Sequence, residues 1–74
     1  MYIRHKRDKY IYRVYGVSRE VQQMPTRGWT EVVTWFLIWD KNDTTNQMDW
    51  RWVNGSEYDM HFDDSYTFRA SGPA

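Results

Sequence analysis

Cysteine is absent from this chain of 74 residues, so neither a disulfide framework nor a thiolate metal site can hold its fold together. No apolar run approaches the roughly 20 residues that a membrane-spanning helix requires, and no hydrophobic export region follows the charged N-terminus. Histidine occurs only twice, and no glycine-rich phosphate loop or nucleophile–base pair is present. We therefore predict a cytoplasmic protein that is not an enzyme, uses no cofactor and does not enter a membrane.

Aromatic side chains are abundant, with five Trp, six Tyr and three Phe. A chain of this length lies near the size at which one hydrophobic core barely outweighs conformational entropy. Each buried aromatic side chain removes roughly 150–250 Å² from water, so these residues must supply most of the core. The sequence predicts a single domain over residues 1–74, with a basic flexible arm at residues 1–8 and a disordered tail at residues 70–74.

The formal net charge is zero, but the charged side chains are unevenly distributed. Residues 1–27 contain seven basic and two acidic side chains, whereas residues 28–74 contain three basic and eight acidic ones. This asymmetry can attract partners of either sign, or the two halves can neutralise each other within the fold.

Residues 28–40 form the most distinctive segment of the chain. After Glu31 no charged side chain occurs before Asp40, and nearly every residue between them is β-branched or aromatic. Such side chains favour a strand over a helix. Because both faces of the segment are apolar, we expect a central strand that is covered on both sides.

Alternating apolar side chains over residues 9–17 predict a strand that pairs with this central strand. Residues 18–24 either continue the strand or form a short helical turn. Pro25 and Gly28 mark the break between the two strands. A five-residue loop over residues 24–28 would place Val17 opposite Trp35.

Residues 42–45 predict a four-residue loop, followed by a third strand over residues 47–53. Met48, Trp50 and Trp52 alternate with polar residues there, so we expect them on one half-buried face. The loop would set Trp39 beside Met48.

Asn54 followed by Gly55 predicts a hairpin turn into a fourth strand over residues 57–63. A two-residue loop would send the apolar side chains of that strand to the wrong face, so the pattern favours a three-residue loop. Trp50 then pairs with Tyr58, or Trp52 does if the loop begins one residue later. Residues 66–69 are expected to form a short fifth strand on an edge.

The predicted fold is all-β, a single antiparallel meander of four to five strands that forms a curled sheet or small open barrel. One face gathers most of the aromatic side chains, and it must close on itself as a core or pack on another molecule. Its members are Ile11, Tyr15, Val17, Val33, Trp35, Leu37, Trp39, Met48, Trp50, Trp52, Tyr58, Met60 and Phe62. The reverse face of the first two strands is an apolar patch that no predicted helix can cover.

This apolar patch and an acidic rim on the later strands are the predicted partner-binding residues. They are Tyr10, Tyr12, Val14, Phe36, Ile38, Asp49, Glu57, Asp59, Asp63 and Asp64. We expect a small, non-catalytic interaction module that occupies a surface of a larger protein. In size and style the chain resembles small inhibitors of bacteriophages and mobile elements, including anti-CRISPR proteins, which implies a host protein as the partner and the host cytoplasm as the location.

A single-stranded nucleic-acid-binding module is the first alternative, because basic residues and tyrosines are interleaved near the N-terminus. The residues concerned are Arg4, Lys6, Arg7, Lys9, Arg13 and Tyr15. The second alternative is a self-assembling structural protein, a homodimer in which the apolar patch pairs with its own copy. Asp59, His61 and Asp63 share one face of the predicted fourth strand, but a solvated polar face explains them better than a metal site.

Overall fold

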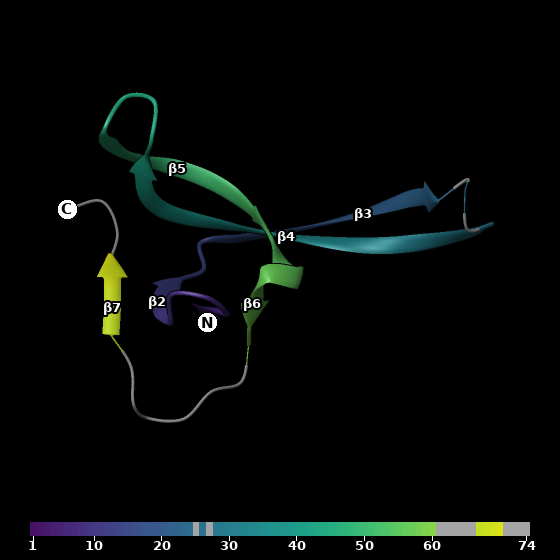
Figure 1. Cartoon of the computed structure of the whole chain (residues 1–74), viewed down its shortest axis with the longest axis horizontal. Helices are drawn as coiled ribbons and strands as arrows, with labels where there is room; N and C mark the ends of the chain where they lie inside the picture. The colour runs from purple at the N-terminus through teal and green to yellow at the C-terminus, as the bar shows by residue number, and fades with distance from the viewer. Residues whose placement is uncertain (25, 27, 61–66, 71–74) are drawn as a thin grey trace.

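A computed structural model of the chain describes residues 1–24, 26, 28–60 and 67–70, the last four by the course of their backbone (Figure 1). Its elements are β1 (Tyr2–His5), β2 (Tyr10–Arg13), β3 (Gly16–Met24), β4 (Trp29–Asn42), β5 (Gln47–Asn54), the 3-10 helix η1 (Gly55–Glu57), β6 (Tyr58–Asp59) and β7 (Thr67–Ala70). The predicted all-β class is therefore confirmed. None of the described residues belongs to a helix long and apolar enough to cross a membrane.

The strands form two sheets, so a single meander of four to five strands describes them only loosely, and the sheets do not close into a barrel. One sheet has the order β6-β1-β2-β7, in which β7 is parallel to β2, and the other has the order β3-β4-β5. The predicted flexible arm at residues 1–8 instead contains β1, in which Ile3 is fully buried. Residue 70, expected in the tail, ends β7, and residues 71–74 lie outside the described residues.

The three hairpins share one loop design. A four-residue loop separates β1 from β2, β3 from β4, and β4 from β5. The last loop residue is left-handed in each case: Lys9 (φ 66°), Gly28 (φ 71°) and Asn46 (φ 61°). Its N–H donates to the carbonyl of the residue that ends the preceding strand: His5 (3.0 Å), Met24 (2.9 Å) and Asn42 (2.7 Å). A left-handed residue in this place turns the chain back into the next strand.

The register of the β3–β4 hairpin differs by one residue from the prediction. Gly16 lies opposite Leu37 and Val17 lies opposite Phe36, because the loop has four residues rather than five. Residues 18–24, for which the sequence allowed either a strand or a helical turn, continue β3 without a shift of register. A slip of one residue exchanges the two faces of a strand, so Val17 shares a face with Phe36 and not with Trp35.

The loop between β4 and β5 has the predicted length of four residues but begins one residue later. Trp39 lies opposite Trp50 rather than Met48. This difference of two residues preserves the faces. The hairpin predicted at Asn54 is wrong: the Asn54 side chain accepts a hydrogen bond from the Ser56 N–H (2.9 Å) and begins η1, which carries the chain away to the other sheet. Of the predicted fourth strand, Tyr58 and Asp59 form β6, which pairs with β1, and residues 61–63 lie outside the described residues.

The core lies between the two sheets. It consists of Ile3, Tyr12 and Tyr58 from the four-stranded sheet, packed with Phe36, Ile38 and Val53 from the three-stranded sheet. The rings of Tyr12 and Tyr58 meet edge-on, with centroids 6.1 Å apart. The covered face of β4 is thus the one that carries Phe36 and Ile38, and the predicted core face, with its tryptophans, points the other way.

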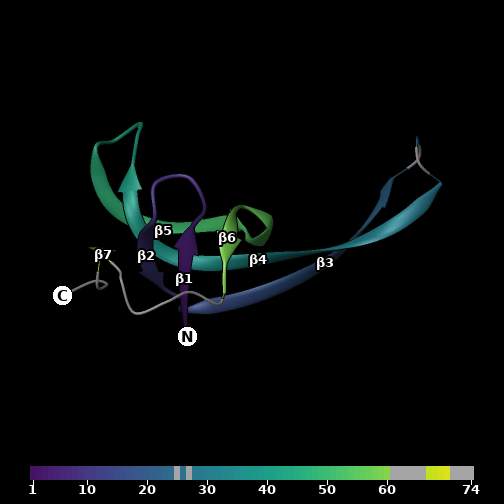
Figure 2. The same ribbon diagram turned by 60° about the horizontal axis from the view of Figure 1, so that its bottom comes forward.

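The outer halves of β3 and β4 extend well beyond the four-stranded sheet, as Figures 1 and 2 show. We call this part, residues 18–24 and 28–34, the distal hairpin. It is exposed on both faces: Val21 and Val32, cross-strand partners on one face, are 69% and 65% exposed, and Trp29 on the other face is 51% exposed. β4 therefore runs from a packed body into an isolated two-stranded ribbon.

Candidate functional site

The predicted apolar binding patch is buried. Tyr12, Phe36 and Ile38 are at most 4% exposed, and Tyr10 and Val14 pack against the same core from its margin. The prediction that these five residues form an exposed binding surface is therefore wrong. Their face is covered by β1, β2 and β6, elements that the sequence pattern had placed in a flexible arm or in the same sheet as β4.

The predicted acidic rim is divided between the two sheets. Asp49 lies on β5 opposite Asp40, whose carboxylate is 3.6 Å from the Arg51 guanidinium. Asp59 lies on β6, half-buried, with its carboxylate 3.9 Å from the Arg4 guanidinium. Glu57 is exposed at the end of η1, and residues 63 and 64 lie outside the described residues. The described acidic residues do not form one continuous rim along a single strand pair.

The basic residues of the nucleic-acid alternative are also dispersed. Arg4 is half-buried beside Asp59, whereas Lys6, Arg7 and Lys9 belong to the exposed β1–β2 turn. The Arg13 guanidinium lies over the ring of Tyr15, 5.3 Å from its centroid. Only these last two residues of the predicted set lie against the aromatic surface described next.

All five tryptophans lie on one face of the three-stranded sheet. The pairing of β4 with β5 places Trp39 opposite Trp50 and Leu37 opposite Trp52, and alternation adds Trp29 and Trp35 to the same face. Trp50 and Trp52 are 45% and 50% exposed, and no described element covers them. We call this surface, Trp29, Trp35, Leu37, Trp39, Met48, Trp50 and Trp52, the tryptophan face.

The rings of the tryptophan face support one another without forming a flat platform. The Trp50 ring meets Trp39 and Tyr15 edge-on, with centroids 5.0 and 5.1 Å apart. The Trp35 indole N–H donates to the Glu20 carboxylate (3.2 Å). Edge-to-face packing of this kind fixes ring positions while leaving ring surface open to a partner.

The charges around the tryptophan face are nearly balanced. By strand alternation Glu20, Glu31 and Lys41 lie on this face. The Arg13 guanidinium reaches its margin, because it lies over the ring of Tyr15, which contacts Trp50. Such a surface has no strong preference for a polyanion or a polycation. Its main property is exposed aromatic area.

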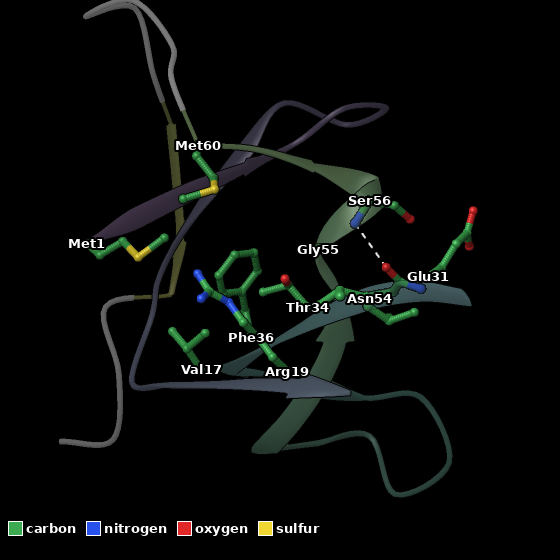
Figure 3. A pocket seen from close by; sticks show the side chains of 12 residues that line it. Met1, Val17, Arg19, Glu31, Thr34, Phe36, Asn54, Gly55, Ser56 and Met60 are labelled. Atoms are coloured by element: carbon green, nitrogen blue, oxygen red, sulfur yellow. Dashed lines mark hydrogen bonds between the residues drawn. The ribbon is translucent and has the colours of Figure 1, made fainter. Parts of the chain in front are cut away.

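A groove lies along the edge of β4 at residues 31–34 and opens mainly on the face opposite the tryptophan face (Figure 3). Its volume is about 670 Å³, and it opens beside the distal hairpin. Val17, Val32 and Phe36 line it from the three-stranded sheet, and Met1 and Met60, which flank β1 and β6, line it from the four-stranded sheet. Arg19, Glu31, Asn54 and Ser56 supply polar groups at its rim. Within residues 1–24, 26 and 28–60, no three His, Asp or Glu side chains are grouped so as to hold a metal ion.

The tryptophan face was visible in the sequence as a set of residues but was assigned to the interior. Trp is large and carries an N–H that needs a partner, so it is rarely fully buried and is enriched at interfaces. Ile and Phe carry no polar atom and fill a small core without that cost. This contrast between the two apolar faces of β4 is the signal that could have identified the open one. Comparison of the chain with protein-family models, with curated proteins and with solved structures gave no match.

Proposed function

We propose that this protein is a non-catalytic interaction module whose tryptophan face binds a larger protein partner. The observation that carries the proposal is the grouping of all five tryptophans on one uncovered face. Extended exposed apolar patches on small soluble proteins usually mark interaction sites, and Trp and Tyr dominate the energetic centres of protein interfaces.

The charge distribution favours a protein over a nucleic acid as the partner. A nucleic-acid surface needs an excess of cations along the phosphate path. The tryptophan face instead carries Glu20 and Glu31 toward one end and Lys41 at the other, and Arg4 is already placed against Asp59. The identity of the partner as a host protein inhibited by a phage or mobile element rests on size and style alone, and it stays a prediction.

The test replaces the two most open rings at the centre of the face. We expect the double variant Trp50→Ser/Trp52→Ser to remain folded, because both side chains are about half exposed, and to bind its partner at least about 100-fold more weakly, because central Trp residues contribute about 2 kcal/mol or more each. The partner is captured with wild-type protein from cells of the source organism, purified, and titrated by calorimetry. The matched control is Tyr2→Ser, which removes an exposed ring (44%) from the other sheet.

Three results would decide the outcome. Equal binding by the double variant and the wild type would overturn the proposal. An affinity that falls by about 10³-fold or more between 50 and 200 mM salt would indicate a nucleic-acid partner instead. Concentration-dependent dimerisation that the double variant abolishes would assign the tryptophan face to a second copy of the chain.

A further inference from the structure

The central strand has an edge that no described residue pairs with. β3 pairs with residues 29–37 of β4, whereas β5 pairs only with residues 35–42. Over residues 30–34, β4 therefore has a neighbouring strand on one side and none among the described residues on the other. β5 leaves β4 after the Trp35–Asn54 pair, where the chain enters η1. The unpaired edge of β4 therefore lies on the same side of β4 as β5.

The backbone groups on this edge can be assigned. The Leu37 carbonyl accepts a hydrogen bond from the Tyr15 N–H (2.8 Å), so the backbone of Leu37 faces β3. Successive residues of an antiparallel strand point their backbone groups to alternate sides. Thr30, Val32 and Thr34 therefore point theirs away from β3. The position of the Thr34 carbonyl oxygen supports this assignment. An added Cβ on Gly55, which follows β5 on the side of β4 away from β3, would lie 3.0 Å from that oxygen.

The groove lies directly beside this edge. In Figure 3 Phe36 and Gly55 lie at its base, Met1 and Met60 lie across from Val17, and the Thr34 side chain points inward. A strand added along the edge would direct every second side chain into this groove. The groove is mainly apolar at its centre and has about 670 Å³ of space for those side chains.

We propose that the open edge of β4 and the adjoining groove bind an extended segment of a partner protein, antiparallel to β4 and in line with β5. The segment carries apolar side chains at alternate positions, because those enter the groove beside Val32 and Phe36. This is strand addition, in which backbone hydrogen bonds supply affinity and the groove supplies specificity. The site is distinct from the tryptophan face and does not depend on it.

The β3 edge of a second copy fits this site less well. One face of β3 alternates Val17, Arg19 and Val21. Pairing β3 there would direct a second Arg19 into a groove that already has one at its rim. Like charges brought together in a partly buried site are unfavourable.

The decisive comparison uses two valines that share one face of the distal hairpin and have similar exposure, but whose backbone N–H groups point to opposite edges. Val32 and Val21 are cross-strand partners with similar exposure (65% and 69%), and alternation points the N–H of each outward, to opposite edges of the hairpin. Proline is tolerated where a strand N–H points to solvent, and it blocks the addition of a further strand. Val32→Pro should therefore close the proposed site, whereas Val21→Pro should not.

The probes are peptides selected from a random twelve-residue display library on the full wild-type chain, then synthesised. We expect selected peptides with apolar residues at alternate positions, about tenfold or more weaker binding to Val32→Pro, and binding to Val21→Pro within about twofold of wild type. If Val32→Pro fails to fold, N-methylation of successive peptide residues replaces it, and only every second position should abolish binding.

Failure to select any peptide, or equal affinity of the selected peptides for both proline variants, would overturn the proposal. So would N-methylation that has no alternating pattern. Peptides whose binding is lost only in the Trp50→Ser/Trp52→Ser variant would also overturn it, and they would support the tryptophan face instead. The two proposals can therefore fail separately.

Discussion

At the scale of single residues, the left-handed loop positions are where the chain departs most from its local preferences. Glycine and asparagine adopt a positive φ more readily than other residues do, whereas Lys9 adopts it at an energetic cost because its Cβ crowds the following carbonyl. An added Cβ at Gly28 would have no heavy atom within 4 Å, so the cost of a side chain there is purely conformational. The two positions therefore form a clean pair for measurement.

We expect Lys9→Gly to raise the free energy of unfolding by about 1 kcal/mol and Gly28→Ala to lower it by about 1 kcal/mol. Urea denaturation with a common slope for all variants measures both changes. Asn46→Gly serves as the control and should change stability by only a few tenths of a kcal/mol. A change of the same sign at Lys9 and Gly28 would contradict the shared loop design.

Residue types also decided how far the candidate site could be predicted. The sequence identified the alternation on β5, but the face of Met48, Trp50 and Trp52, which was predicted to be half-buried, is exposed, and Val53 of the other face is buried. Periodicity did not say which face of β4 is covered, since both faces are apolar, and only the difference between Trp on one face and Phe36 and Ile38 on the other carried that information. The strands that cover them, β1 and β6, are too short and too rich in charged or polar neighbours to be identified by periodicity.

At the scale of elements, the distal hairpin should be the least protected part of β4. A two-stranded ribbon with few buried contacts is marginally stable by itself. We expect the amides of Glu31 and Val33 to exchange with solvent at least about tenfold faster than those of Phe36 and Ile38, as measured by NMR hydrogen exchange. Glu31 and Val33 pair with β3, and Phe36 and Ile38 pair with β5. Because all four residues lie in paired strands, a difference in exchange rate reports packing rather than the presence of interstrand hydrogen bonds. Uniform protection along β4 would refute this expectation.

Loop length explains the errors in element pairing. The loop between β4 and β5 has the predicted length of four residues, at 43–46 rather than 42–45, so the faces of β4 and β5 were correctly matched. Between β3 and β4 one residue too many was assigned to the loop, and a single residue suffices to exchange the faces. Asn54 and Gly55 have the composition of a hairpin turn, yet the contact between Gly55 and the ring of Phe36 requires tertiary packing that no local pattern contains.

At the scale of the whole molecule, Tyr58 joins the two sheets and makes stability sensitive to alkaline pH. Burial raises the pKa of Tyr58 from 10.0 to about 12, opposed by Arg51 and assisted by Asp40. The folded protein therefore holds this proton more tightly than the unfolded chain does. The resulting stability is fully present below pH 10 and is lost as the pH rises toward about 12.

Thermal or urea unfolding across this alkaline window should show a loss on the order of 2 kcal/mol that Tyr58→Phe removes. The lysines titrate in the same range, so the comparison with the variant is essential. Tyr2→Phe, at an exposed position of the same sheet, should follow the wild-type curve. Identical curves for Tyr58→Phe and wild type would show that Tyr58 is not the group responsible.

The four-stranded sheet is built from the two ends of the described chain, since Arg4 pairs with Asp59 and Ile11 with Phe68. Contacts between residues so distant in sequence form slowly, because a long loop must close first. During synthesis β3, β4 and β5 leave the ribosome before β6 and β7 do. The face of Phe36 and Ile38 therefore waits for β6 to complete its cover in the newborn chain, although both side chains are almost fully buried once folding ends.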